Sequence, residues 1–250
     1  MELKILQWNV WYKEKPENII LVLKEIDADI LCLQELTDVS EENPGVSVVD
    51  EITKALAYNS KYFVAQTWSD VDIPVMTMGN GIFSKLDFVS DRGFFIQDSG
   101  NNNPRYDDEG RVYGEVDILV GKNKKLTVAT THMSYTHAFE GSKKRDEENR
   151  QLHKALPTNP KNYVFCGDLN TVPQSAFIQS FPEKSGLIPA LFYNDNTWTT
   201  KPFDYEGFKA DTLDYRLDYV YTSIDVDVIS AEVMQTDVSD HLPILTTIRI

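Results

Sequence analysis

A series of short segments that are apolar on both of their alternating faces constrains the fold most. Residues 3–12 carry apolar side chains on both alternations, and residues 30–33 and 163–166 are continuous apolar runs. Such segments are typical of strands buried between two layers, because a strand with one wet face would alternate apolar and polar residues. The sequence therefore predicts sheets that are covered on both faces.

Helical patterns separate some of these strands. Pro16 opens the first pattern, with apolar residues at three- and four-residue spacing, and others follow over residues 51–57 and 142–156. Further strands are expected over residues 62–67, 82–84, 112–120, 126–131, 217–222, 226–233 and 245–250, with long loops over 37–50, 66–78, 98–110 and 193–212. No linker or repeat divides the chain, so we expect one domain over residues 1–250, an α/β fold of two packed mixed sheets flanked by helices.

The net charge of −15 comes from 24 basic and 39 acidic residues and argues against a protein that binds bulk duplex nucleic acid. The basic residues cluster at two places. Lys122, Lys124 and Lys125 are expected in a solvated turn, whereas Lys143 to Arg145 are left open between a solvated face and a functional one. A cation bound in the site would supply the positive charge that the surface lacks.

No membrane-spanning segment or signal peptide is expected, because the chain lacks both a long apolar run and a basic start followed by apolar residues. Cys32 and Cys166 lie in apolar runs and are expected to be buried free thiols. These features predict a cytoplasmic protein with no stable membrane anchor, a monomer by default.

Polar residues recur at the ends of the apolar strands. Buried runs deliver Asn9, Glu35, His132, Asp168 and Asn170 at their carboxyl ends, Asp218 lies within a strand, and Ser239-Asp240-His241 precedes the last one. Rigid strand ends are where convergent sites are built. Each residue alone has a structural explanation, such as a turn former, a cap or a satisfied histidine at a sheet rim. The ordered set makes coincidence improbable.

The ordered set resembles the endonuclease/exonuclease/phosphatase family. The resemblance rests on Trp8-Asn9, Leu33-Gln34-Glu35, Gly79-Asn80-Gly81-Ile82-Phe83-Ser84-Lys85, Thr131-His132, Gly167-Asp168-Leu169-Asn170-Thr171, Arg216-Leu217-Asp218-Tyr219-Val220 and Ser239-Asp240-His241-Leu242-Pro243. These motifs run in the family's order and cover nearly the whole chain. The resemblance implies a four-layered α/β sandwich with its site at one edge of the two sheets.

The resemblance also implies a metal ion, Mg²⁺ or Mn²⁺. Mg²⁺ prefers carboxylate and amide oxygens, and Glu35 would be the principal ligand, with Asn9 beside it and Asp240 contributing directly or through water. The ion would polarise a phosphoryl oxygen and offset the charge on the leaving oxygen.

The remaining motif residues are expected to handle the phosphate and the attacking water. By resemblance, Asp168 orients or deprotonates the water, and Asn170 donates to a phosphate oxygen or to the nucleophile. His241 would donate to a non-bridging oxygen, with Asp218 fixing its tautomer, and His132 would be a second donor. The choice of general base between Asp168 and His241 stays open.

Several other residues are weaker candidates. Asn80 and Arg111 are possible substrate contacts, although a solvated face is the favoured interpretation for Arg111. Arg150 is expected either at a recurrent family position or in an ion pair, and His137 and His153 are expected at the surface. The aromatic residues of 193–212 would either stack on a substrate or fold back over the core.

These features predict a metal-dependent phosphodiesterase that uses in-line attack by water. A strand end, abasic site or adduct in nucleic acid is the favoured substrate. A small molecule or a sphingomyelin-like lipid headgroup is the first alternative. The lipid is the less favoured of the two, because the sequence shows no apolar anchor. A non-catalytic binding module with the same fold is the second alternative.

Overall fold

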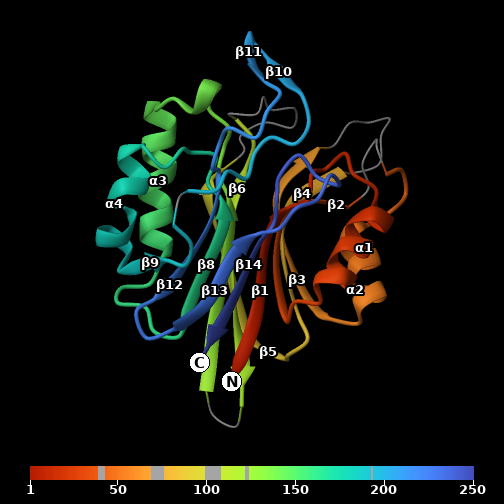
Figure 1. Cartoon of the computed structure of the whole chain (residues 1–250), viewed down its shortest axis with the longest axis vertical. Coiled ribbons are helices and arrows are strands. Elements are labelled where there is room, and N and C mark those ends of the chain that lie inside the picture. Colours follow the sequence, from red (N-terminus) through yellow and green to blue (C-terminus); the bar gives the residue numbers. More distant parts are fainter. Residues whose placement is uncertain (39–42, 69–75, 99–107, 122–123, 193) are drawn as a thin grey trace.

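The computed structural model describes residues 1–38, 43–68, 76–98, 108–121, 124–192 and 194–250. Within them, two six-stranded sheets pack face to face, and helices cover the outer face of each sheet (Figure 1). The predicted four-layered α/β sandwich is therefore confirmed. No helix among the described residues is long and apolar enough to cross a membrane.

The first sheet has the strand order β13-β14-β1-β2-β4-β3. Its strands are β1 (Glu2–Asn9), β2 (Ile30–Asp38), β3 (Asn59–Trp68), β4 (Met76–Ser84), β13 (Asp227–Val233) and β14 (Ile244–Arg249). β1 and β2 run parallel, whereas the other neighbours pair antiparallel, so the sheet is mixed. Helices α1 (Pro16–Ile26) and α2 (Val48–Leu56) cover its outer face.

The second sheet has the order β5-β6-β7-β8-β12-β9. Its strands are β5 (Phe88–Gln97), β6 (Arg111–Val120), β7 (Lys124–His132), β8 (Tyr163–Asp168), β9 (Leu187–Pro189) and β12 (Asp218–Ser223). β7 and β8 are its parallel pair. Helices α3 (Lys143–Ala155) and α4 (Ala176–Ser185) cover its outer face, and a short helix η1 (His137–Phe139) follows β7. A hairpin of β10 (Phe203–Tyr205) and β11 (Phe208–Ala210) projects at one end (Figure 1).

The main core lies between the two sheets. Ile5 and Ile82 from the first sheet pack with Val128 and Val164 from the second, and all four are fully buried. Removing such a side chain from water contributes roughly 1.5–3 kcal/mol. Cys32 and Cys166 lie in this core as free thiols, as predicted. This packing makes the sheet edges a rigid support for the polar residues beyond them.

The sequence analysis missed several elements, for local reasons. β5 is an edge strand with most of its side chains exposed, so it lacks an alternating apolar pattern. α4 contains Pro182, which usually ends a helix, but Ser175 caps its start by accepting from the amide of Ile178. The predicted loop over 193–212 contains the β10–β11 hairpin, while residues 39–42, 69–75 and 99–107 of the other predicted loops lie outside the described part of the chain.

Candidate active site

The strand ends predicted to carry the chemistry converge at one edge of the two sheets. The parallel pair β1–β2 brings Asn9 and Glu35 together, and the parallel pair β7–β8 sets His132 opposite Asp168. β12 runs antiparallel to β8, so its first residue, Asp218, also pairs with Asp168. All these side chains therefore meet at the same end of the sandwich, as the sequence predicts.

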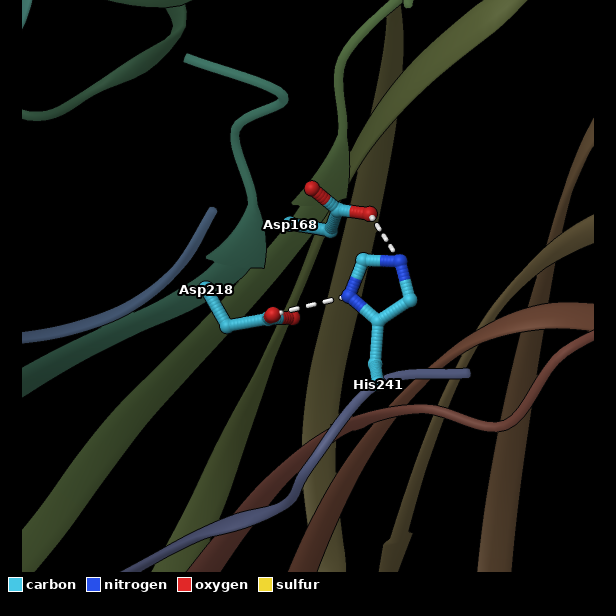
Figure 2. A group of neighbouring side chains, drawn as sticks. All are labelled: Asp168, Asp218 and His241. Atoms are coloured by element: carbon cyan, nitrogen blue, oxygen red, sulfur yellow. Dashed lines mark hydrogen bonds and ion pairs between the residues drawn. The ribbon is translucent and has the colours of Figure 1, made fainter. Parts of the chain in front are cut away.

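His241 lies between two buried carboxylates (Figure 2). Its Nδ1 atom is 2.8 Å from Oδ2 of Asp218, and its Nε2 atom is 3.6 Å from Oδ2 of Asp168. The three side chains lie close enough together to hold a metal ion. However, Asp218 already engages Nδ1, which leaves Nε2 as the ring nitrogen that faces Asp168.

A bulge in β2 turns Glu35 towards the site. The register between β2 and β4 shifts between Leu33 and Leu36, and Glu35 has a positive φ of 58°. A residue other than glycine rarely adopts this conformation, and such strain is concentrated at functional sites. The Oε2 atom of Glu35 accepts from the amide of Tyr12 at 3.0 Å.

Asn9 joins the two sheets through its side-chain amide. Its Nδ2 atom donates to Oε1 of Glu35 and to Oδ2 of Asp168, both at 3.0 Å. Its Oδ1 atom accepts from the amide of Trp11. In this orientation Asn9 presents nitrogen rather than oxygen to the carboxylates, so its predicted role as a metal ligand requires the amide group to turn over.

The segment 239–241 is held by hydrogen bonds to its neighbours. The Ser239 hydroxyl donates to the carbonyl of Asn9 at 2.7 Å and accepts from the amide of His241 at 3.0 Å. The indole of Trp198 donates to Oδ2 of Asp240 at 3.2 Å. Ser239, expected to be a simple turn residue, thus positions both residues that follow it.

Asn170 and His132 form the other side of the site. Asn170 has a positive φ of 45°, and its amide donates to Oδ1 of Asp168 at 2.9 Å. Its side-chain nitrogen lies 3.1 Å from Nε2 of His132 and donates to the carbonyl of Met133. The Nε2 atom of His132 is also 3.5 Å from Oδ2 of Asp168. Asn170 and His132, both predicted phosphate donors, therefore lie beside Asp168.

Arg111 is buried, so the favoured interpretation of a solvated face is wrong. Only 3% of its surface is exposed, since its guanidinium pairs with Glu109 at 2.7 Å and lies 3.4 Å from Nδ1 of His132. Asn80 is buried too, and its amide donates to the carbonyl of Val112 at 3.1 Å, which links β4 to β6. Substrate contacts by Arg111 and Asn80 stay predictions.

The two imidazoles of the site differ in charge. Burial alone would lower the pKa of His241, but Asp218, Asp168 and Asp240 raise it well above the usual value. For His132, burial lowers the pKa well below the usual value, and the positive charges of Arg111 and His241 add to the effect. These shifts favour the cationic form of His241 and the neutral form of His132.

Two carboxyl groups bind protons unusually tightly. Burial raises the pKa of Asp168 to about 7, with a further contribution from Asp218, although His241 opposes the shift. Burial also raises the pKa of Asp240 to about 6, and Glu35 and Asp218 act in the same direction. Crowded carboxylates of this kind are the surroundings in which a divalent cation is bound.

The sequence analysis assigned no role to several buried residues that hydrogen-bond behind the site and hold its side chains in place. Gln7 donates to Gln34 and, at 3.3 Å, to Oδ1 of Asp218, and Gln34 donates to the hydroxyl of Thr130. All of these side chains are fully buried. The available signal was a polar residue inside an otherwise apolar run. Gln7 lies two positions before Asn9, and Gln34 lies one position before Glu35.

Arg145 was also missed as a supporting residue. Its buried guanidinium donates to the carbonyls of Leu169 at 3.0 Å, Asn170 at 3.3 Å and Ser134. By contrast, Arg150 is exposed and pairs with Glu147. Of the two interpretations left open for Arg150, the structure therefore supports the ion pair.

The histidines outside the site differ from each other. His137 is exposed, as predicted, whereas His153 is half-buried against Phe177 and Phe181, so its prediction as a surface residue is wrong. Of the first basic cluster, Lys122 lies outside the described residues, while Lys125 pairs with Asp117 at 2.7 Å.

Trp198, Phe203 and Phe208 fold back over a small core of their own. Trp198 is buried and packs against Phe139 and Phe203 at centroid distances of 5.4 and 5.1 Å. Together with its bond to Asp240, this packing favours the covering role left open by the sequence.

The two packed sheets and the acid–imidazole cluster at their edge define a class of α/β sandwich proteins with a buried polar site. Within that class, the chain belongs to the Endonuclease/Exonuclease/phosphatase family, whose sequence model matches residues 6–241. Members of this family are generally metal-dependent hydrolases, and phosphoesterases are found among the structural neighbours.

Similar solved structures share the fold at low sequence identity. An endonuclease/exonuclease/phosphatase from Beutenbergia cavernae DSM 12333 matches with a TM-score of 0.75 and 19% identity, over 100% of this chain and 72% of that one. The mannosyl-6-phosphatase Bt3783 of Bacteroides thetaiotaomicron VPI-5482 matches at 0.69 and 15%, over 99% and 100%. D. rerio TDP2, complexed with a single-strand DNA product, matches at 0.70 and 17%, over 100% and 99%. No curated protein matches the sequence significantly.

Proposed function

We propose that this protein is a phosphoesterase that depends on Mg²⁺ or Mn²⁺ and transfers the phosphoryl group directly to water. The observation that carries the proposal is the position of Asp168. Its Oδ2 atom lies between Nδ2 of Asn9, at 3.0 Å, and Nε2 of His241, at 3.6 Å. A carboxylate held between a cationic imidazole and Asn9, one of the expected metal ligands, suits the activation of water beside a phosphate.

Asp168 is the general base in this proposal, and His241 is the donor. His241 is cationic, because three carboxylates raise its pKa, and a cationic imidazole cannot accept a proton. Asp168 has a pKa of about 7, close to the value at which a base is both ionised and effective near neutral pH. This difference in pKa supports Asp168 over His241 as the general base.

The reaction then proceeds in one displacement. The oxygen of water forms a bond to phosphorus, its proton passes to Asp168, and the ester P–O bond breaks on the opposite side. His241 and Asn170 donate to the non-bridging oxygens, and neutral His132 is a further donor. The leaving oxygen takes a proton from solvent, which completes the alcohol.

Glu35 and Asp240 are the residues proposed to hold the metal ion. They supply carboxylate oxygens, which Mg²⁺ and Mn²⁺ prefer, and the charge of Glu35 contributes to the raised pKa of Asp240. Asn9 holds Glu35 in place and offers its own oxygen if its amide group turns over. When bound, the ion would act as a Lewis acid towards the phosphoryl oxygen.

The described residues beside the site favour a small phosphoester over a nucleic acid strand. Of the basic run 143–145, Arg145 is buried, Lys144 pairs with Asp108, and Lys143 is exposed. This run does not supply the basic groove that binding to a strand would need. A strand end or adduct in nucleic acid stays a prediction from the sequence.

Hydrolysis of an activated aryl phosphate tests the proposal. p-Nitrophenyl phosphate and bis(p-nitrophenyl) phosphate would be incubated with Mg²⁺, Mn²⁺ or EDTA. We expect metal-dependent release of nitrophenol that Asp168→Asn abolishes, whereas the exposed Asp204→Asn variant remains active. Release that persists in EDTA or in Asp168→Asn would contradict the proposed roles, and no release from either substrate would favour a binding module.

A further inference from the structure

A pocket of about 240 Å³ lies where four segments meet. Its walls come from the end of β5 at Gln97, residues 134–137 after β7, the first turns of α3, and the turn of the β10–β11 hairpin at Tyr205 and Glu206. This hairpin projects at the top of Figure 1, beyond the carboxyl end of β1 and so at the same end of the sheets as the site.

The pocket adjoins the proposed active site. Ser134, which lines it, follows His132 by two residues, so their Cα atoms are at most about 7 Å apart. Arg145, another wall residue, donates to the carbonyls of Ser134 and Asn170. One buried guanidinium thus connects the pocket wall to the loop that carries a proposed phosphate donor. A ligand group in the pocket would therefore lie near a phosphate that is bound beside His132 and Asn170.

Among the described residues that line the pocket, the basic side chains of Lys144 and Arg145 are matched by the carboxylates of Glu148 and Glu206. Lys144 pairs with Asp108, and Arg145 lies 3.7 Å from the carboxylate of Glu148. Glu206 adds a further carboxylate to the lining. A second phosphate of a nucleic acid strand would bring negative charge next to these carboxylates, which is unfavourable. The lining therefore favours a neutral group.

Rings and hydroxyl groups make up much of the remaining lining. The rings of Tyr135 and Tyr205 lie 6.0 Å apart at 82°, and the hydroxyls of Ser134, Thr136 and Ser142 also line the pocket. Tyrosine combines an apolar ring with a polar tip, and hydroxyls both donate and accept. Pockets for drug-sized ligands are larger, roughly 300–1,000 Å³, so this one suits a single ring.

From this lining we infer that the pocket binds the hydroxylated ring of a phosphorylated sugar or cyclitol, the alcohol that leaves in the proposed reaction. The apolar faces of such a ring contact the tyrosines, and its hydroxyl groups donate to the carboxylates and exchange hydrogen bonds with Thr136 and Ser142. The inference rests on the proposed phosphoesterase activity and specifies its substrate class.

Steady-state kinetics of two pocket variants test the inference. Tyr205→Ala removes a ring from the wall, and Thr136→Val removes a hydroxyl group without changing the size of the side chain. Lys209→Ala is the matched control, because Lys209 lies in the same hairpin, is largely exposed and pairs with Asp204. The substrates are hexose 6-phosphates, inositol monophosphate, propyl phosphate as a ringless phosphomonoester, and a single-stranded oligonucleotide.

We expect hexose 6-phosphates or inositol monophosphate to be the preferred substrate. A comparison of kcat/KM for these two substrates distinguishes a sugar from a cyclitol. Tyr205→Ala should lower kcat/KM for the preferred ring phosphate by about tenfold or more, with Thr136→Val lowering it less. Both variants should leave kcat/KM for propyl phosphate within about twofold of wild type. Lys209→Ala should match wild type on every substrate.

Three results would overturn the inference while leaving phosphoesterase activity intact. Both variants could affect propyl phosphate as strongly as ring phosphates, neither variant could change any substrate, or the oligonucleotide could be the best substrate. Failure of the wild-type protein to hydrolyse even activated aryl phosphates would instead overturn the proposed function itself.

Discussion

The Nδ1 atom of His241 lies 2.8 Å from Oδ2 of Asp218, and both side chains are buried. This contact fixes the orientation of the imidazole and aims Nε2 at Asp168. It also keeps the ring protonated, because the charge of Asp218 is the leading reason for the raised pKa of His241 against the opposing effect of burial.

Replacing Asp218 should therefore impair the chemical step. In Asp218→Asn the amide can no longer hold a cationic imidazole, so we expect kcat for an aryl phosphate to fall by roughly 10²–10⁴-fold with little change in KM. The pH at which the essential donor loses its proton should move down. An unchanged pH–rate profile would contradict the role of Asp218 as the partner of His241.

Replacing Glu35 should weaken metal binding. In Glu35→Gln the concentration of Mg²⁺ or Mn²⁺ for half-maximal activity should rise by about tenfold or more, since even outer partners of a metal typically contribute that much. The exposed Glu25→Gln variant on α1 is the control and should behave as wild type. Titrations of activity against metal concentration would measure both, and identical curves for Glu35→Gln and wild type would place the ion elsewhere.

The stabilisation of the fold by metal should increase with pH. Burial raises the pKa of Asp168 to about 7 and of Asp240 to about 6, above the value of 3.8 for an unperturbed aspartate. Without metal, the folded state binds these protons more tightly than the unfolded state, so their contribution to stability is present at low pH and is lost as the pH rises through these values. A bound cation offsets that loss.

Thermal unfolding measures this effect. Excess MgCl₂ should raise Tm more at about pH 8 than at about pH 5, relative to EDTA. The difference should shrink in Glu35→Gln. A metal-induced shift in Tm that is the same at both pH values would count against this prediction.

Arg145 should stabilise the fold as well as the site. Arg145→Leu leaves the buried carboxylate of Glu148 without its ion pair and removes one donor from each of three carbonyls, and breaking a buried pair typically costs roughly 3–5 kcal/mol. Arg150→Leu removes an exposed pair on the same helix and should cost less than about 1 kcal/mol. Urea unfolding of the two variants gives the comparison, and equal losses would contradict it.

His153 should make the protein sensitive to acid. Both of its ring nitrogens are buried without a hydrogen-bond partner among the described residues, and burial lowers its pKa from 6.5. The unfolded state takes up a proton first as the pH falls through that value, so stability decreases there. His153→Phe should lose less stability between about pH 7 and about pH 5 than wild type does. The free energy of unfolding at the two pH values provides the measurement.

The sequence predicts the strands that carry the site because their signal is local. Asn9, His132 and Asp168 each end a strand that contains a buried apolar run, and Glu35 follows such a run within β2. Their order along the chain is enough to suggest convergence. The elements that were missed either lack a buried face of their own, as β5 does, or contain a residue such as Pro182 that argues against the element.

The residues that support the site depend on contacts between distant segments. Arg145 resembles a surface residue in the basic run 143–145, and its burial follows from the packing of α3 against the loop at Leu169 and Asn170. Gln7 and Asp218 are 211 positions apart, so their contact has no local signature. A pattern along the chain does not report such pairings, because they arise when the two sheets pack.

The amide of Asn9 spans from Glu35 on the first sheet to Asp168 on the second. The catalytic rate therefore depends on how the two sheets are packed against each other. It is more sensitive to a shift between the sheets than the secondary structure content is. Mild denaturant that lets the sheets slide by a fraction of an ångström should inactivate the enzyme while its circular dichroism is still that of the native protein.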